Sequence, residues 1–360
     1  MKILTTKASI RNPFLIHNLP FAAKIYRLRK GKFKKLSLAG KVFKKLIPGK
    51  PFLAWLLKFF PIGRYGSFDY QAATNNINIK FNIRNTQFHS VYFPQYKISY
   101  EPETTVLIDL ILNQNPDGVF FDVGANWGHM SLHAASSKLF KGEIHSFEPF
   151  LTSYQDLSQI VEQSGKKSMI ETHHLAVSDV DGVCYIGLPD NFNSGNAEVS
   201  TQNTGDGQKV ESQKIDSMNF KAPDLIKIDV EGFEINVLMG ARETLKKSKP
   251  MIIFENWADL NKVKDTLAPF KYLRELGYHF FEPSFLIDEE KDHSEGSYFA
   301  GYSHIQTLNE SCHDSGKELP FSLIEFIPEQ RFLLKDQLNV FACHGDKLEF
   351  LDQHFKQFQA

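Results

Sequence analysis

The stretch VFFDVGANWGHMSL, residues 119–132, decides the fold of this chain. It joins a nearly continuous apolar run, typical of a strand buried on both faces, to a helical pattern through a glycine-containing turn. Gly124 allows the sharp turn, Gly128 allows the helix to pack closely on the sheet, and the loop between them directs backbone N–H groups at a ligand. The stretch predicts the first strand–turn–helix unit of a nucleoside-binding α/β fold.

Strands and helices alternate after this unit. In chain order we expect a strand at 143–149, a helix at 151–163, a strand at 170–178, a strand at 224–229, a helix at 233–247, a strand at 251–257 and a helix at 260–276. Such alternation requires a parallel sheet with right-handed crossovers. The predicted class is a doubly wound, mostly parallel α/β fold, in which residues 278–283 and 339–345 form a closing hairpin.

The loop after the first strand distinguishes two classes of nucleoside cofactor. Glu148 ends the next predicted strand, where a carboxylate can accept both ribose hydroxyls. Dinucleotides require the G-x-G-x-x-G spacing because the backbone must approach a pyrophosphate, but here Asn126 occupies the second glycine position. S-adenosylmethionine has no phosphate and carries an ammonium, a carboxylate and a sulfonium, which suit Asp122 and Asn126 better. The loop therefore favours S-adenosylmethionine over NAD.

Several blocks between about residues 100 and 257 occur in an order that resembles the FkbM-type methyltransferase family. The blocks are VFFDVGANWGHMSL, IHSFEP, LAVSD, LIKIDVEGFEINVLMGA and PMIIFE. The resemblance implies a class I methyltransferase fold of the Rossmann-like type. It also implies methyl transfer from S-adenosylmethionine to a hydroxyl, often on a sugar or a polyketide-type product.

The same resemblance implies where the cofactor binds. The methionine part would contact Asp122, Gly124, Asn126 and Gly128, the ribose Glu148, and the adenine Ala176, Val177 and Ser178, with Asp229 closing the pocket. Tyr100 and Glu101, just before a predicted helix, fit the entry of that helix better than the wall of the pocket. The substrate that accepts the methyl group would be recognised by residues outside the matching blocks.

The acceptor hydroxyl must be aligned and its proton accepted. Asp229 and Glu231 are two residues apart and share a face if the strand continues, where each carboxylate raises the pKa of the other. Either could be the base, although Asp229 could serve only the cofactor and Glu231 could only cap the next helix. His129 and Glu255 are further candidates for the base. No metal site is expected.

The charge of the 360 residues is unevenly distributed. Residues 1–68 hold 16 of the 41 Lys and Arg and no Asp or Glu, which leaves 25 basic against 42 acidic residues over 69–360. Apolar residues interleave with the lysines, so we expect an N-terminal arm of short basic helices. This arm could contact an anionic membrane surface or glycolipid, or pack on the acidic body.

The remaining chain divides by pattern. We expect a β-hairpin lead-in at 69–99, built from an alternating run after residue 77 and the run FHSVYF. The methyltransferase domain follows at 100–283, and residues 284–360 hold a polar insertion with the closing strand and helix. Polar tracts at 189–210 and 286–318 are expected to be loops that shape a pocket or insertions exposed to solvent.

The expected function is O-methylation of a small molecule, glycan, glycolipid or secondary metabolite. The alternative is a catalytically inactive α/β protein that the basic arm recruits to lipid or nucleic acid. No specific nucleic-acid partner is expected, because the body is acidic. No run reaches the roughly 18 apolar residues that are needed to cross a bilayer. The three cysteines are far apart in the sequence, which indicates neither a disulfide framework nor a zinc site. The expected location is cytoplasmic, with possible attachment to a membrane surface.

Overall fold

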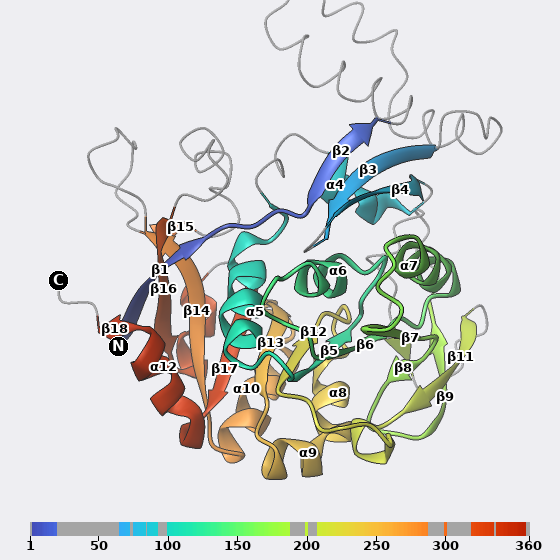
Figure 1. The fold of residues 1–360 in the computed structure, drawn as a ribbon. Coiled ribbons are helices and arrows are strands. Elements are labelled where there is room, and N and C mark those ends of the chain that lie inside the picture. Colours follow the sequence, from blue (N-terminus) through green and yellow to red (C-terminus); the bar gives the residue numbers. More distant parts are fainter. Residues whose placement is uncertain are drawn as a thin grey trace, which may run out of the picture.

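The computed structural model describes residues 2–19, 65–72, 75–83, 85–92, 99–187, 199–200, 207–286, 299–300, 318–334 and 336–357. Within these residues an eleven-stranded sheet passes through the molecule (Figure 1). Five neighbouring strands of this sheet are parallel: β5 (Val119–Val123), β6 (Glu143–Phe147), β7 (Ile170–His173), β12 (Leu225–Ile228) and β13 (Met251–Trp257).

The spatial order of the parallel strands confirms the predicted fold class. The order is β7-β6-β5-β12-β13, so that the first strand in the chain lies in the middle and the later strands extend to both sides. This is the doubly wound arrangement 3-2-1-4-5 of nucleotide-binding folds. Every residue of β5 and β12 is buried, as the apolar runs predicted. The order places a switch point between β5 and β12, where ligands bind in such sheets.

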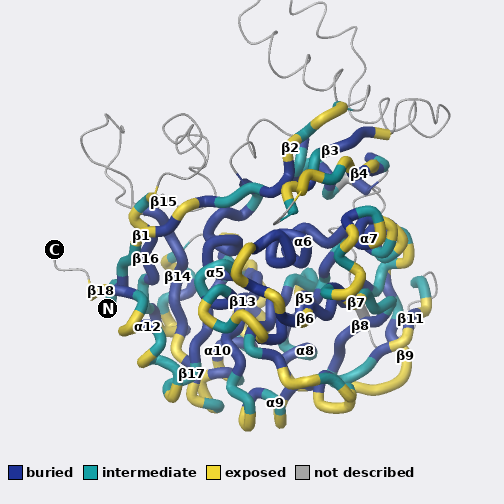
Figure 2. Tube along the Cα trace, in the orientation of Figure 1, coloured by how far each residue is buried: buried dark blue, intermediate teal, exposed yellow. Residues whose placement is uncertain are grey.

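Helices cover both faces of the sheet. They are α5 (Pro102–Gln114), α6 (His129–Ala135), α7 (Leu151–Gln163), α8 (Glu234–Gly240), α9 (Arg242–Lys247) and α10 (Val263–Glu275). The apolar residues of the first three helices pack with Phe120 and Ile144, and those of the last three pack with Phe121 and Ile226. Side chains of adjacent strand residues point to opposite faces, which explains the two separate cores. Figure 2 shows this buried centre.

The other half of the sheet is antiparallel. It consists of β14 (Tyr278–Leu286), β15 (Phe299–Ala300), β16 (Glu318–Phe326), β17 (Gln337–His344), β1 (Ile3–Ser9) and β18 (Lys356–Gln357). β17 lies between β13 and β14 and pairs with β14, which confirms the closing hairpin. The C-terminal helix α12 (Leu348–His354) follows. β16 was not predicted.

The prediction of a helical N-terminal arm is wrong for the described part of residues 1–68. β1 pairs with β16 in the main sheet, and β2 (Phe14–Asn18) pairs with β3 (Tyr65–Gln71) in a separate three-stranded sheet. β-branched residues in the run ILTTKAS favour a strand, and its lysine stays exposed at the surface. Residues 20–64, which carry most of the basic charge, lie outside the described residues, and so does the expected membrane contact.

The predicted hairpin is also different from the observed one. β4 (Asn76–Asn82) pairs with β3, and residues 86–92 form the helical turns η2 (Thr86–Phe88) and α4 (His89–Tyr92). Phe88 and Tyr92 lie four residues apart, so a helical turn directs both rings toward Phe81, with centroid distances of 4.8 and 6.3 Å. These tertiary contacts outweigh the strand propensity of the run.

A third sheet lies beside β7. It contains β8 (Ala176–Val177), β9 (Gly182–Ile186), β10 (Val199–Ser200) and β11 (Gln208–Gln213). Most of the two polar tracts, residues 188–198, 201–206, 287–298 and 301–317, lies outside the described residues. In the part of the chain that the structure describes, no helix has the length and apolar character needed to cross a membrane.

Arg11 ties the N-terminal strands to the body. Its guanidinium contacts the Asp109 carboxylate at 2.5 and 3.1 Å and the His133 carbonyl oxygen at 2.9 Å. Burial alone would raise the pKa of Asp109, but His133 and Arg11 lower it to about 2, so the carboxylate stays ionised.

We expect Arg11→Met to lower the free energy of unfolding by about 1–3 kcal/mol, because the Asp109 carboxylate loses a charged partner. Urea unfolding followed by circular dichroism measures the change. Lys7→Met is the matched control, since Lys7 is exposed on β1 and should change stability by less than about 0.5 kcal/mol. Equal stability of the two variants would contradict the role of Arg11.

Candidate active site

A pocket opens at the carboxyl end of the parallel strands, at the switch point between β5 and β12. Its walls come from the loops that follow β5, β6, β12 and β13, together with the segment before α5 and residues of β9 and β17. Loops after parallel strands meet at one edge of the sheet, so residues far apart in the chain converge there.

The turn after β5 depends on Gly124. Gly124 has a φ of 80°, and a Cβ at this position would lie 1.8 Å from the carbonyl oxygen of Asp229 on the neighbouring strand end. The N–H groups of Gly124 and Ala125 both donate to the Phe147 carbonyl oxygen at 3.0 Å. Asn126 follows with a φ of 50°, a conformation that asparagine tolerates better than most residues. The turn is therefore fixed against both neighbouring strands.

Asp122 lies beneath this turn and is completely buried. Its Oδ2 accepts hydrogen bonds from the N–H and the hydroxyl of Ser131, at 3.1 and 2.5 Å, which anchors the first turn of α6. Burial raises the pKa of the carboxyl group. Its Oδ1 has no hydrogen-bond partner among the described residues. A buried oxygen without a partner is costly, and here it borders the pocket.

Glu148 follows β6 on the other side of the turn. Its two oxygens accept backbone hydrogen bonds from Asn126 and Phe150, each at 2.8 Å. Burial raises its pKa to about 7, although the two backbone donors oppose this rise. A carboxylate has about four acceptor positions, so two remain for the hydroxyls of a ligand. The carboxylate is thus both oriented and able to bind.

Lys227 brings a single cation into the pocket. It lies on β12 two residues before Asp229, and its ammonium is 2.8 Å from the Asp229 carboxylate. Burial would lower its pKa, but Asp229, Asp122 and Glu101 raise the pKa above its usual range. Lys227 is therefore charged and holds Asp229 in place.

Two further carboxyl groups face this ion pair. Glu255 accepts hydrogen bonds from the Trp257 indole, at 3.0 Å, and from the Gln337 amide. Burial raises its pKa to about 9, and the nearby Asp229 and Glu101 carboxylates add to this rise. Glu101 itself is buried at the start of α5, where burial raises its pKa to about 6. At neutral pH Glu255 is mostly protonated.

The structure brings together most of the residues that the sequence pointed to. Those that line the pocket are Tyr100, Glu101, Asp122, Gly124, Asn126, His129, Glu148, Asp229, Glu231 and Glu255. Glu101 does stand at a helix entry, as the sequence favoured, yet it also faces the pocket. Gly128 begins α6 behind the turn, with a φ of 92°. Ala176, Val177 and Ser178 are buried and are not among the residues that line the pocket.

His129 lies deep in the pocket wall. Its ring packs against Phe14, Tyr100 and Trp127, with centroid distances of 4.6, 5.4 and 5.2 Å. Neither ring nitrogen has a hydrogen-bond partner among the described residues. Burial lowers its pKa well below the usual range, so the imidazole is neutral, with one ring nitrogen able to donate a hydrogen bond and the other able to accept one.

Several lining residues escaped the sequence analysis, among them Lys227, Trp257 and Gln337. Lys227 could have been found, because residues two apart on a strand share a face and it precedes Asp229 by two. Trp257 ends a predicted strand, but nothing local marks it as half exposed at a pocket. Gln337 reaches the pocket only because β17 is inserted beside β13.

The charge of the pocket is strongly unbalanced. Six carboxyl groups line it: Glu101, Asp122, Glu148, Asp229, Glu231 and Glu255. Lys227 is the only Lys or Arg among the described residues that line it. The oxygens of Asp229, Glu231 and Glu255 lie within 4.8 Å of one another. Such a pocket attracts a cationic ligand and repels a polyanion.

Residues 122–280 match the family model described as the methyltransferase FkbM domain. Among solved structures, the chain is similar to the methyltransferase FkbM from Methylobacillus flagellatus KT, with 20% identity and a TM-score of 0.30 over 39% of this chain and 33% of that chain. It is similar to an SAM-dependent O-methyltransferase from Thermotoga maritima, with 11% identity and a TM-score of 0.34 over 76% and 81% of the two chains. It is also similar to an O-methyltransferase from Bacillus cereus in complex with SAH, with 9% identity and a TM-score of 0.33 over 63% of this chain and 82% of that chain. No curated protein matches the chain.

Proposed function

Residues 122–280 are a methyltransferase FkbM domain, and from this premise we propose that the protein transfers the methyl group of S-adenosylmethionine to a hydroxyl of a glycan, glycolipid or secondary metabolite. The observation that carries the proposal is the excess of acidic over basic side chains in the pocket, which six carboxyl groups and one lysine line. S-adenosylmethionine carries two positive groups and no phosphate. The pyrophosphate of a dinucleotide would meet carboxylates where it needs N–H donors.

The groups present fit the parts of this cofactor. Glu148 offers two acceptor positions for the ribose hydroxyls, and the free Oδ1 of Asp122 can accept from the ammonium. Gly124 leaves the turn bare of a side chain, and Asn126 adds an amide beside it. Phe150 and Ile186 supply apolar surface next to Glu148, against which the adenine ring of the cofactor can pack.

The residues around Lys227 are suited to the proton transfer. S-adenosylmethionine supplies a methyl group that a positively charged sulfur activates. Glu255, with a pKa of about 9, is protonated at neutral pH and can donate a hydrogen bond to the acceptor. Asp229 or Glu231 then accepts the proton of the hydroxyl, and Lys227 keeps Asp229 oriented. His129 is a weaker candidate because its burial opposes protonation.

The pocket rim supports an acceptor of the sugar type. Trp257 is 51% exposed there, with its indole N–H fixed by Glu255. An exposed indole face packs well against the apolar face of a sugar ring, while acid and amide groups bind its hydroxyls. Gln337 and Glu231 supply such groups next to Trp257.

We expect isothermal titration calorimetry on the full chain to show S-adenosylmethionine binding at least about tenfold more tightly than NAD. The reason is the repulsion between the pyrophosphate and the pocket carboxylates. S-adenosylhomocysteine serves as a second ligand that lacks the sulfonium charge and should bind more weakly. If NAD binds and S-adenosylmethionine does not, the proposed function fails.

Transfer of a labelled methyl group to fractions of a cell extract then separates an active enzyme from an inactive binding protein. A labelled product that is sensitive to glycosidases supports the glycan or glycolipid acceptor. Binding of the cofactor without any labelled product would favour the inactive alternative.

A further inference from the structure

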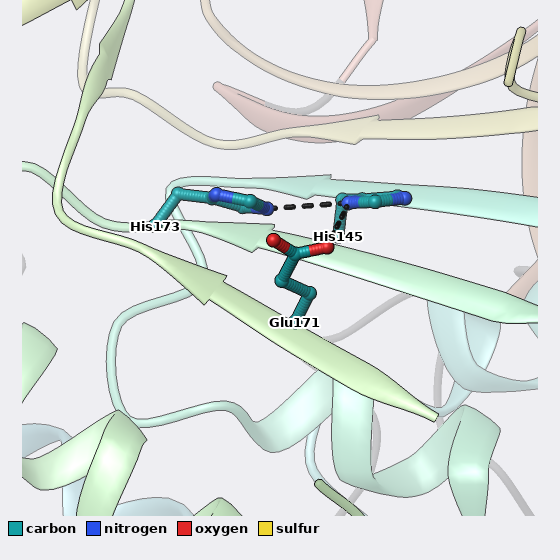
Figure 3. Close-up of side chains that lie close together, drawn as sticks. All are labelled: His145, Glu171 and His173. Carbon is teal, nitrogen blue, oxygen red and sulfur yellow. Dashed lines mark hydrogen bonds and ion pairs between the residues drawn. The ribbon is translucent and has the colours of Figure 1, made fainter. Parts of the chain in front are cut away.

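A second group of ligand-type side chains lies on the sheet away from the pocket. His145 is on β6, and Glu171 and His173 are on the adjacent strand β7 (Figure 3). None of the three lines the pocket. The parallel register places His145 opposite Glu171, and residues two apart share a face, so all three side chains project from the same side of the sheet.

The potential ligand atoms of these residues converge. His145 Nδ1 is 3.2 Å from His173 Nε2 and 3.6 Å from a carboxylate oxygen of Glu171. Two ligands bound to zinc at about 2.0–2.1 Å with tetrahedral angles are about 3.3–3.4 Å apart. The two observed separations lie on either side of this value. One ligand atom from each of the three residues lies within 4.8 Å of the other two, close enough to bind one ion.

Aromatic packing holds the two imidazoles in place. The Phe220 ring stacks on His145 at 4.3 Å and contacts His173 at 5.1 Å, and Phe147 stacks on His173 at 4.7 Å. The side chain of Glu171 is 63% exposed, so solvent reaches the group from that side.

We propose that His145, Glu171 and His173 bind a divalent transition-metal ion, with Zn²⁺ fitting the ligand set best and water completing its coordination. Two imidazoles and one carboxylate are a common ligand set for zinc with an open fourth position. Because the ligands come from two neighbouring strands, the ion would join β7, which ends this side of the main sheet, to β6. The Glu148 N–H also donates to the His173 carbonyl oxygen at 3.0 Å, so the ion would stiffen the strand end that carries the pocket carboxylate.

The proposal is tested on the full chain after removal of metals with a chelator. Titration with Zn²⁺ alone, against a chromophoric chelator as competitor, should show one equivalent bound and a rise in Tm. We expect Glu171→Gln to weaken this binding at least about tenfold and His173→Gln about 100-fold. Both variants should lose the Zn²⁺-dependent rise in Tm. Cobalt in place of zinc should give the intense visible bands of tetrahedral coordination.

His279→Gln is the matched control. His279 is half exposed and forms a histidine–carboxylate pair with Glu325 at 3.4 Å, but no second imidazole joins it among the described residues. This variant should bind Zn²⁺ like the wild type. If the wild type binds no equivalent of Zn²⁺, or if Glu171→Gln and His173→Gln both bind it unchanged, the contact between the two histidines is only a hydrogen bond. Because the readouts are metal binding and Tm, they are independent of methyl transfer.

Discussion

Gly124→Ala is expected to lower the free energy of unfolding by about 2–5 kcal/mol and to abolish cofactor binding. The new Cβ would lie 1.8 Å from the Asp229 carbonyl oxygen, so β5 and β12 must separate at the pocket. Alanine is also disfavoured at a φ of 80°. Overpacking costs about 1–3 kcal/mol and the left-handed backbone about 1–2 kcal/mol more. Urea unfolding measures the stability, and calorimetry with S-adenosylmethionine measures the affinity.

Gly142→Ala is the control that distinguishes a general steric loss of stability from a specific loss of the cofactor site. A Cβ there would lie 1.9 Å from the Gly118 carbonyl oxygen, a comparable clash, but Gly142 precedes β6 at the opposite edge of the sheet. This control should lose about 1–3 kcal/mol and keep the affinity of the folded protein for the cofactor. Wild-type affinity in Gly124→Ala would show that the turn does not form the cofactor site.

Glu148→Gln is expected to weaken S-adenosylmethionine binding at least about 100-fold. The carboxylate offers two acceptor positions to the ribose, and each hydrogen bond to a charged group contributes about 1.5–3 kcal/mol. An amide offers one oxygen, which can accept from only one of the two backbone N–H groups, and its NH2 group then faces the other donor. Glu143→Gln, an exposed position on the same strand, is the control and should bind normally.

The same residue gives the binding a pH dependence. Glu148 accepts both hydroxyls only when ionised, and its pKa is about 7. Affinity should therefore rise as the pH increases from 6 to 8 in the wild type and stay flat in Glu148→Gln. A wild type whose affinity falls over this range would contradict the assignment of Glu148 to the ribose.

Stability should change in the opposite direction. The pKa of Glu148 is higher in the folded chain than in the unfolded chain, so the folded state binds more protons between about pH 4.5 and 7. Ionisation of the buried group then lowers the free energy of unfolding as the pH rises, by about 1.4 kcal/mol per unit of pKa difference. Glu148→Gln removes this loss. The stability of the variant should therefore fall less than that of the wild type as the pH rises from 6 to 8, which distinguishes lost binding from misfolding.

The local sequence was sufficient to predict the strands and helices of the parallel half of the sheet. Strands and helices there are specified by buried apolar runs and by helical spacing, both of which depend on near neighbours in the chain. The cofactor turn is equally local, because Asp122, Gly124 and Asn126 stand within five residues of one another. The family resemblance implied what such a turn does in related chains, and residues 122–280 match the model of the FkbM methyltransferase domain.

Contacts between distant segments decided the secondary structure in the N-terminal part of the chain. Residues 3–9 pair with β16, more than 300 positions later, and although their β-branched residues favour a strand, no local pattern shows which strand they join. Residues 88–92 are helical because the Phe88 ring packs against Phe81 and Trp127.

In the pocket, too, some residues could be predicted from the sequence and others only from the tertiary structure. The sequence by itself determined the turn, Glu148 and the acids after β12, because those positions follow from strand ends. Only the tertiary structure placed Gln337 beside Glu255 and set the charge balance around Lys227. Burial and strand order set which charges meet and at what pKa, and neither quantity exists until the chain has folded.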